Sequence, residues 1–159
     1  MSFSPRQFTN LRNYPEHRDR RGIVFINAEF SLCDALIQQI SPELRVIVIG
    51  SQTNGIKEIS RILCSSCCRE IYIIAQGSPG CLYLGTTELS LNTLINNSSE
   101  LESWFRNPTK AMLKDHRLYL YGSNVAAGDV GAEFIGKLSS ILGATIGASL
   151  RVSQNNILT

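Results

Sequence analysis

Two short polar stretches hold the side chains in this sequence whose types and spacing could do chemistry. They are residues 76–80 (Gln-Gly-Ser-Pro-Gly) and residues 122–128 (Gly-Ser-Asn-Val-Ala-Ala-Gly), and each directly follows an apolar run. In open α/β sheets, ligands and catalytic side chains gather at the carboxyl ends of the strands. We therefore expect Gln76 and Ser123 to lie side by side in one site.

Neither side chain is an obvious catalyst, because the Gln76 amide has no basic atom and the Ser123 hydroxyl needs an adjacent base to become a nucleophile. His116 precedes a predicted strand and should lie about 15 Å away at its other end. His17 lies near the amino terminus, and Cys81 follows the first polar stretch without a base nearby. We expect a site that binds rather than catalyses, built from Gln76, Gly77, Ser78, Ser123 and Asn124.

The cysteines do not predict a metal centre or a disulfide framework. The sequence has 5 cysteines, an odd number that fits a reducing compartment. Cys64, Cys67 and Cys68 form a local cluster, but no second pair stands at the spacing of a zinc site. We expect no metal and no cofactor.

Length, composition and charge favour one domain that contacts other proteins. The chain has 159 residues, is 43% hydrophobic and is only 18% charged, against about 25% in ordinary soluble domains. An uncharged polar surface is easier to desolvate against a partner. No apolar run approaches the about 20 residues needed to span a bilayer, and no secretory signal precedes the domain. The expected location is the cytoplasm.

Residues 1–21 are predicted to form a basic arm, followed by a domain at residues 22–152 and a tail at residues 153–159. Five arginines against Glu16 and Asp19 give the arm a charge of +3, which leaves −1 for the rest of a chain of net charge +2. The domain is therefore not a basic platform for nucleic acid. A solvated terminus is the simple interpretation of such an arm. Its apolar residues also have the spacing to enter a groove on a partner protein while the arginines pair with carboxylates. The partner-binding residues that we expect are Phe3, Arg6, Phe8, Arg12 and Tyr14.

The elements that must position the two polar stretches alternate between strands and helices. Apolar runs predict strands at residues 23–27, 45–49, 71–75, 117–121 and 144–148. Helical spacing of apolar residues predicts helices at residues 32–40, 56–63 and 129–142. Residues 81–89 alternate around a central glycine, which indicates a small hairpin after the third strand. We expect an α/β fold: a single-domain three-layer sandwich with a mostly parallel sheet in the order 2-1-3-4 and a fifth strand beyond the fourth.

Individual side chains refine these helices. Ile56, Ile59, Ile62 and Leu63 share one face of the second helix. Ser90 can cap one short helix, and Ser98 or Ser99 another whose apolar side holds Leu101, Trp104 and Phe105. In the last helix we expect Val130, Phe134, Leu138 and either Ile141 or Leu142 to face the sheet, with Gly143 ending it.

Several of these segments resemble a bacterial, largely cyanobacterial family, domain of unknown function 4347, over about residues 21 to 152. The Asn-Val-Ala-Ala-Gly segment is the most specific part. The segments that carry the resemblance are residues 23–27, 54–56, 77–80, 82, 84–85, 121–128, 134 and 142–144. The family's pattern has His-Gly after the third strand and Gly-Cys after the fourth. That arrangement is similar to the catalytic dyad of caspase, gingipain and separase-like cysteine peptidases, so the resemblance implies a caspase-like fold.

Here both dyad positions differ from the family pattern, since Gln76 stands in place of the histidine and Ser123 in place of the cysteine. A Cys/His dyad depends on imidazole accepting a proton near neutral pH to give a thiolate. The double replacement fits natural loss better than deliberate inactivation. We expect a non-catalytic, peptidase-like interaction or structural subunit of a larger protein assembly.

Two alternatives remain open at this point. One is a cysteine or serine hydrolase with an unconventional dyad. The other is a small-ligand or nucleotide-binding module, in which the glycine turns at residues 50–55 and 77–80 offer backbone N–H groups to phosphates. No established phosphate-binding motif is present, and glycine also serves tight turns alone.

Overall fold

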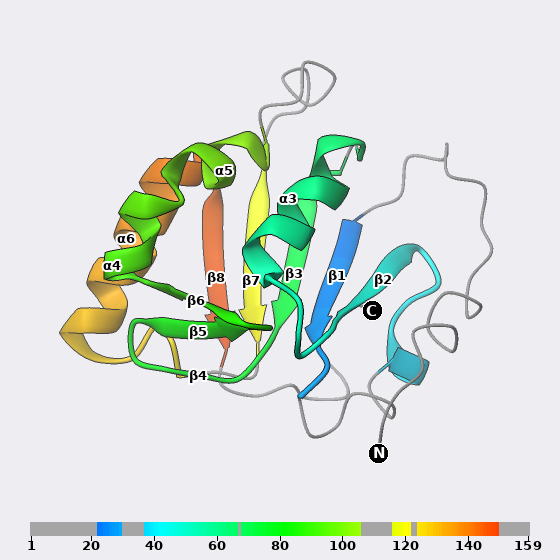
Figure 1. The fold of residues 1–159 in the computed structure, drawn as a ribbon, viewed down its shortest axis with the longest axis horizontal. Coiled ribbons are helices and arrows are strands. Elements are labelled where there is room, and N and C mark those ends of the chain that lie inside the picture. Colours follow the sequence, from blue (N-terminus) through cyan, green and yellow to red (C-terminus); the bar gives the residue numbers. More distant parts are fainter. Residues whose placement is uncertain (1–21, 30–36, 67, 106–115, 122–123, 150–159) are drawn as a thin grey trace.

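Five parallel strands form the central sheet of the computed structural model, which describes residues 22–29, 37–66, 68–105, 116–121 and 124–149 (Figure 1). The strands are β1 (Gly22–Asn27), β2 (Leu44–Ile49), β3 (Glu70–Ile74), β7 (Arg117–Tyr121) and β8 (Thr145–Ser149). Their order is β2-β1-β3-β7-β8, and every neighbouring pair is parallel. The predicted order and the α/β layered fold are confirmed. The arm at 1–21 and the tail at 153–159 lie outside the described residues.

One face of the sheet, here called the helical face, is closed by four helices. These are α3 (Gly55–Cys64), α4 (Leu91–Asn96), α5 (Ser98–Ser103) and α6 (Gly128–Leu142). Their apolar side chains share one core with alternate residues of the strands, and Trp104, Phe25 and Phe134 are the largest fully buried side chains in it. The Trp104 indole also donates to the Ser60 hydroxyl over 2.8 Å, which satisfies its buried N–H.

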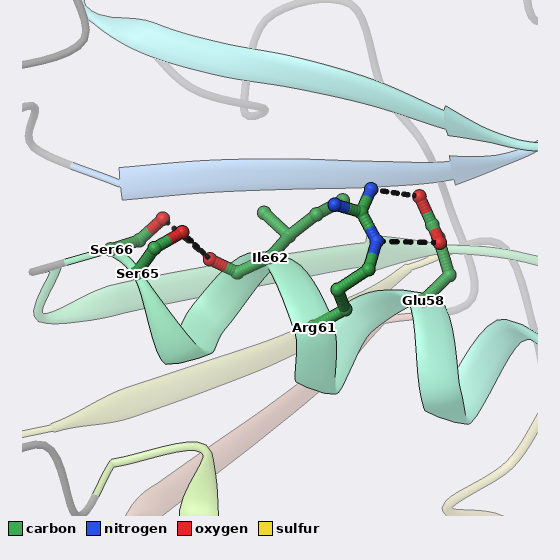
Figure 2. Close-up of polar contacts among 5 residues, drawn as sticks. All are labelled: Glu58, Arg61, Ile62, Ser65 and Ser66. Carbon is green, nitrogen blue, oxygen red and sulfur yellow. Dashed lines mark hydrogen bonds and ion pairs between the residues drawn. The ribbon is translucent and has the colours of Figure 1, made fainter.

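Helix α3 follows its sequence pattern closely. The Asn54 side chain accepts a hydrogen bond from the Lys57 N–H at 3.1 Å, which caps the first turn. The predicted face of Ile56, Ile59, Ile62 and Leu63 is buried. On its outer surface Arg61 donates twice to Glu58, and beyond its last turn Ser65 and Ser66 both donate to the Ile62 carbonyl (Figure 2).

Helix α6 corrects one predicted contact. Phe134, Leu138 and Leu142 are buried as expected, but Val130 is 52% exposed. Gly131 takes the inward position instead, and a Cβ there would lie 2.3 Å from the Ala126 carbonyl carbon. One residue along an α-helix is a rotation of about 100°, so Val130 falls off the buried stripe. Gly143 ends the helix with φ of 64° and donates to the Ser139 carbonyl, as predicted.

The short helices α4 and α5 follow one another with Asn97 between them, and one predicted cap is wrong. Ser90 precedes α4, and its N–H is bonded to Thr93 Oγ1 at 2.8 Å. The residue before α5 is Asn97, whereas Ser98 is already its first helical residue. Asn97 donates through its side chain to the Thr93 carbonyl of α4, and this side chain makes no capping hydrogen bond to α5. The residues predicted for the apolar side, Leu101, Trp104 and Phe105, are buried.

The opposite face of the sheet carries a cluster of three tyrosines, Tyr72, Tyr119 and Tyr121, and is here called the tyrosine face. The Tyr72 and Tyr119 rings stack with centroids 5.0 Å apart, and each lies 6.4 Å from the Tyr121 ring. Ile37 and Ile40 pack over the neighbouring part of this face, against β1, β2 and β3. They belong to the helix predicted at 32–40, of which residues 32–36 lie outside the described residues.

No helix within the described ranges is both long and apolar enough to cross a bilayer. The longest, α6, has 15 residues and carries exposed charges on its outer side.

Candidate functional site

The carboxyl ends of β3 and β7 lie next to each other, as the two polar stretches predicted. Ile74 pairs with Tyr121 in the sheet, and the Ala75 N–H donates to the Tyr121 carbonyl at 3.2 Å. Gln76 thus leaves the sheet beside the point where residues 122–123 begin. Ser123 itself lies outside the described residues, so the predicted contact between the two side chains stays a prediction.

Gly77 and Ser78 form a strand rather than a free turn, which corrects the expected structure of this stretch. A second sheet contains β4 (Gly77–Ser78), β5 (Cys81–Leu84) and β6 (Thr87–Ser90), all antiparallel. Pro79 and Gly80, with φ of +72° at Gly80, close the β4–β5 hairpin. The predicted β5–β6 hairpin is present. Strand β4 was missed, because a strand of two residues has no periodicity that a sequence could reveal.

Three of the predicted binding residues, Gln76, Ser78 and Asn124, are exposed at this edge. The Gln76 carbonyl accepts a hydrogen bond from the Tyr83 N–H at 3.0 Å, which joins it to the hairpin. The Gly80 N–H donates to the Val125 carbonyl at 2.8 Å and ties the β4–β5 turn to the residue after Asn124. The structure therefore brings the stretches at 76–80 and 124–126 together.

Asn27, at the end of β1, belongs to the same edge and was not predicted as a site residue. Its side chain is 2% exposed, and its Oδ1 accepts from the Gly85 N–H at 3.3 Å. Its Nδ2 donates to the Tyr83 carbonyl, also at 3.3 Å. The sequence signal for it was a polar residue ending an otherwise apolar strand.

The loop at residues 50–55 packs against the β5–β6 turn. The Thr86 N–H donates to the Thr53 carbonyl at 2.8 Å, and a Cβ on Gly85 would lie 1.9 Å from that same carbonyl oxygen. Within the loop, the Thr53 N–H donates to the Gly50 carbonyl at 3.1 Å. With the Gly80 amide bonded to Val125, at least one N–H group in each glycine turn already has a partner inside the chain. This arrangement favours packing over phosphate binding as the role of the glycines.

The titratable groups near the edge are poorly suited to nucleophilic chemistry. Burial, followed by the charge and hydrogen bond of the Glu88 carboxylate 3.7 Å away, raises the pKa of the Cys81 thiol. A raised pKa leaves little thiolate at neutral pH. His116 precedes β7 at the opposite end of the sheet, where its ring stacks on Phe105 with centroids 4.8 Å apart. That end is about 16 Å from the carboxyl edge along β7.

Among the residues described here, no three His, Cys, Asp or Glu side chains lie close enough together to hold a metal ion. Cys64 is exposed, Cys68 is buried and Cys81 is half-buried, whereas Cys67 lies outside the described part of the chain. The expected partner-binding residues Phe3, Arg6, Phe8, Arg12 and Tyr14 also lie outside it.

Of the comparisons with known proteins, the one with family models gave a match. Neither a curated protein nor a solved structure matches it. Residues 23–156 match the family described as domain of unknown function (DUF4347), a span that contains every described helix and strand except the first residue of β1. The chain therefore belongs to the DUF4347 family.

Proposed function

We propose that this protein is a non-catalytic, peptidase-like interaction or structural subunit of a larger protein assembly, with a caspase-like fold. The observation that carries the proposal is the pairing of β3 with β7. It ends the two strands side by side at Ile74 and Tyr121, just before the two positions at which the resemblance to the family implies His and Cys. In this chain those positions hold Gln76 and Ser123. A site with the layout of a dyad and without its acid–base chemistry is suited to binding.

The surroundings of Gln76 support the absence of catalysis. A nucleophile needs a general base within about 3 Å, and the His116 ring lies at the far end of β7. Cys81 is the described thiol near this edge, and burial beside Glu88 holds its pKa above the ordinary range. Gln76, Ser78 and Asn124 instead offer exposed amide and hydroxyl groups without net charge. Such groups can be buried against a protein surface at lower cost than charges.

A covalent probe tests the absence of catalysis. The protein is incubated at neutral pH with a fluorophosphonate and, separately, with a thiol-directed chloromethyl ketone, and labelled residues are located by peptide mass spectrometry. We expect no labelling of Ser123 above that of the exposed Ser140 on α6. Stoichiometric labelling of Ser123 would favour the hydrolase alternative.

Charge introduction tests the binding role of the edge. Ser78→Lys combined with Asn124→Lys places two charges on the proposed surface, and Asn92→Lys places one on an exposed position of α4 as a control. Affinity purification of each variant from the native cell, with quantitative mass spectrometry, measures the associated proteins. We expect the edge variant to lose a stoichiometric partner that the control retains. If the edge variant and the control retained the partner equally, the partner would bind a surface other than this edge.

We also propose the basic arm of residues 1–21 as a second contact with that partner. Its five arginines and its aromatic residues suit an acidic groove, and a free arm would lose conformational entropy on ordering. Deleting residues 1–20 should leave the melting temperature nearly unchanged and weaken assembly. A large fall in melting temperature with intact assembly would make the arm part of the core.

A further inference from the structure

Asn27 has a buried polar side chain whose hydrogen bonds all go to one small element. Apart from tyrosine and cysteine, it is the one polar or charged residue that is buried within the described ranges. Its Oδ1 accepts from Gly85 and its Nδ2 donates to the Tyr83 carbonyl, and both groups belong to the β5–β6 hairpin. Burying an amide costs free energy unless it is hydrogen-bonded. A contact of this kind joins the central sheet to the small sheet at one fixed position.

The same contact reaches the candidate binding edge through Tyr83. The Tyr83 carbonyl accepts from Asn27, while its N–H donates to the Gln76 carbonyl at 3.0 Å. Tyr83 therefore connects the end of β1 to the residue that follows β3. The Thr86–Thr53 bond and the Asn54–Gly85 bridge hold the turn of the hairpin, while the pairing of β5 with β4 begins one residue after Gln76.

We propose that Asn27 is a positioning residue that sets the place of Gln76 at the carboxyl edge of the sheet. The inference rests on the proposed function only where it treats this edge as a binding surface, since the placement can be measured without a partner. The site requires one group that both accepts from an N–H and donates to a carbonyl within the same small space. A primary amide meets that requirement, whereas an apolar side chain of similar size meets neither half.

Asn27→Asp turns this requirement into a pH dependence. A protonated carboxyl keeps both bonds, because its O–H donates to the Tyr83 carbonyl and its other oxygen accepts from Gly85. An ionised carboxylate can only accept, and it would face the Tyr83 carbonyl oxygen. Burial raises the pKa of this carboxyl in the folded state above its unfolded value. The variant is then most stable below the unfolded pKa of this carboxyl, and it loses stability as the pH rises from that value through the raised pKa of the folded state.

The measurement is NMR-detected hydrogen exchange, corrected for the intrinsic pH dependence of the rate. In Asn27→Asp we expect the Tyr83 amide to keep its wild-type protection near pH 4. At pH 8 the protection factor of the Tyr83 amide should fall about tenfold or more, which is the effect of a shift of roughly one unit in the pKa of the carboxyl. Asn27→Leu should lose that protection at both pH values. The amides of Phe25 and Ile73, within the paired strands β1 and β3, provide the internal reference. Exposed Asn96→Asp on α4 is the matched control and should show no pH dependence.

Two results would overturn the proposal. One is protection of the Tyr83 amide in Asn27→Asp that does not change with pH. The other is a loss that is equal at Phe25 and Ile73, including complete unfolding at pH 8, because Asn27 would then support the whole fold and not one edge. Retained partner binding in a variant whose Tyr83 protection is lost would count against the proposed function alone.

Discussion

The two faces of the central sheet are built from different side chains and are closed to different degrees. On the helical face, α3, α4, α5 and α6 bury aliphatic and aromatic residues completely, including Phe134 and Trp104. On the tyrosine face, Tyr72 is buried, whereas Tyr119 and Tyr121 keep part of their surface exposed. Phenol rings can stack in a sheet and still present a hydroxyl to water. Ile37, Ile40 and the buried strand residues beside them close the rest of this second face, so the tyrosines are the part of it that we expect to tolerate change.

Truncation on the helical face should have the largest effect. Phe134→Ala removes a fully buried ring that packs on the sheet, and the expected loss in the free energy of unfolding is about 3 to 5 kcal/mol. Urea denaturation followed by circular dichroism measures it. A loss below about 1 kcal/mol would mean that α6 does not close this core, since removal of a surface side chain has an effect of that size.

The equivalent truncation on the tyrosine face should have a smaller effect. Tyr119 is half-buried and stacks on Tyr72, so Tyr119→Ala should lower the free energy of unfolding by about 1 to 2 kcal/mol. Tyr119→Phe keeps the stacked ring and serves as the control. If Tyr119→Ala were as destabilising as Phe134→Ala, the two faces would be energetically equivalent and the comparison would fail.

Alkaline pH should distinguish the faces further. Burial, followed by the charges of Tyr119 and Glu70, raises the pKa of Tyr121. A phenol whose pKa is raised by folding contributes stability that is full below its unfolded pKa, near 10, and is lost as the pH rises through the folded value. Tyr121→Phe should therefore lose less stability than the wild type above about pH 10. Melting curves between pH 8 and 11 give the comparison, and identical slopes would contradict it.

The outer surface of α3 should contribute least. The hydrogen bond and charge of Arg61 (Figure 2) lower the pKa of Glu58, but the Arg61 side chain is exposed and that of Glu58 is partly exposed. A lowered carboxyl pKa gives stability above the unfolded pKa that is lost as the pH falls through the folded value. Arg61→Ala should change the melting temperature by little more than the error at pH 7 and not at all at strongly acid pH. A clear loss that persists in acid would require a role for Arg61 besides the ion pair.

Sequence patterns predicted most of the elements on the helical face and fewer of the details at the site. The buried stripe of α3 was correct because four aliphatic residues recur with helical spacing. In α6 the pattern placed Val130 inward. In the structure Gly131 faces inward instead, where it lies close to Ala126, and Val130 is exposed. The pairing of Gly77 and Ser78 with β5 was missed, because two residues carry no period.

The sequence by itself determined the strands of the central sheet, their order and the family, because long apolar runs mark each strand and the crossover rule places successive strands side by side. It also placed the stretch at Gln76 beside the end of β7. Only the tertiary structure decided that Asn27 would fasten Tyr83 to the sheet, and that three tyrosines would stack on one face. Those contacts join residues 56 and 47 positions apart, for Asn27–Tyr83 and Tyr72–Tyr119 respectively. No local pattern specifies such a contact, because its free energy depends on where the two backbones are held by everything else in the fold.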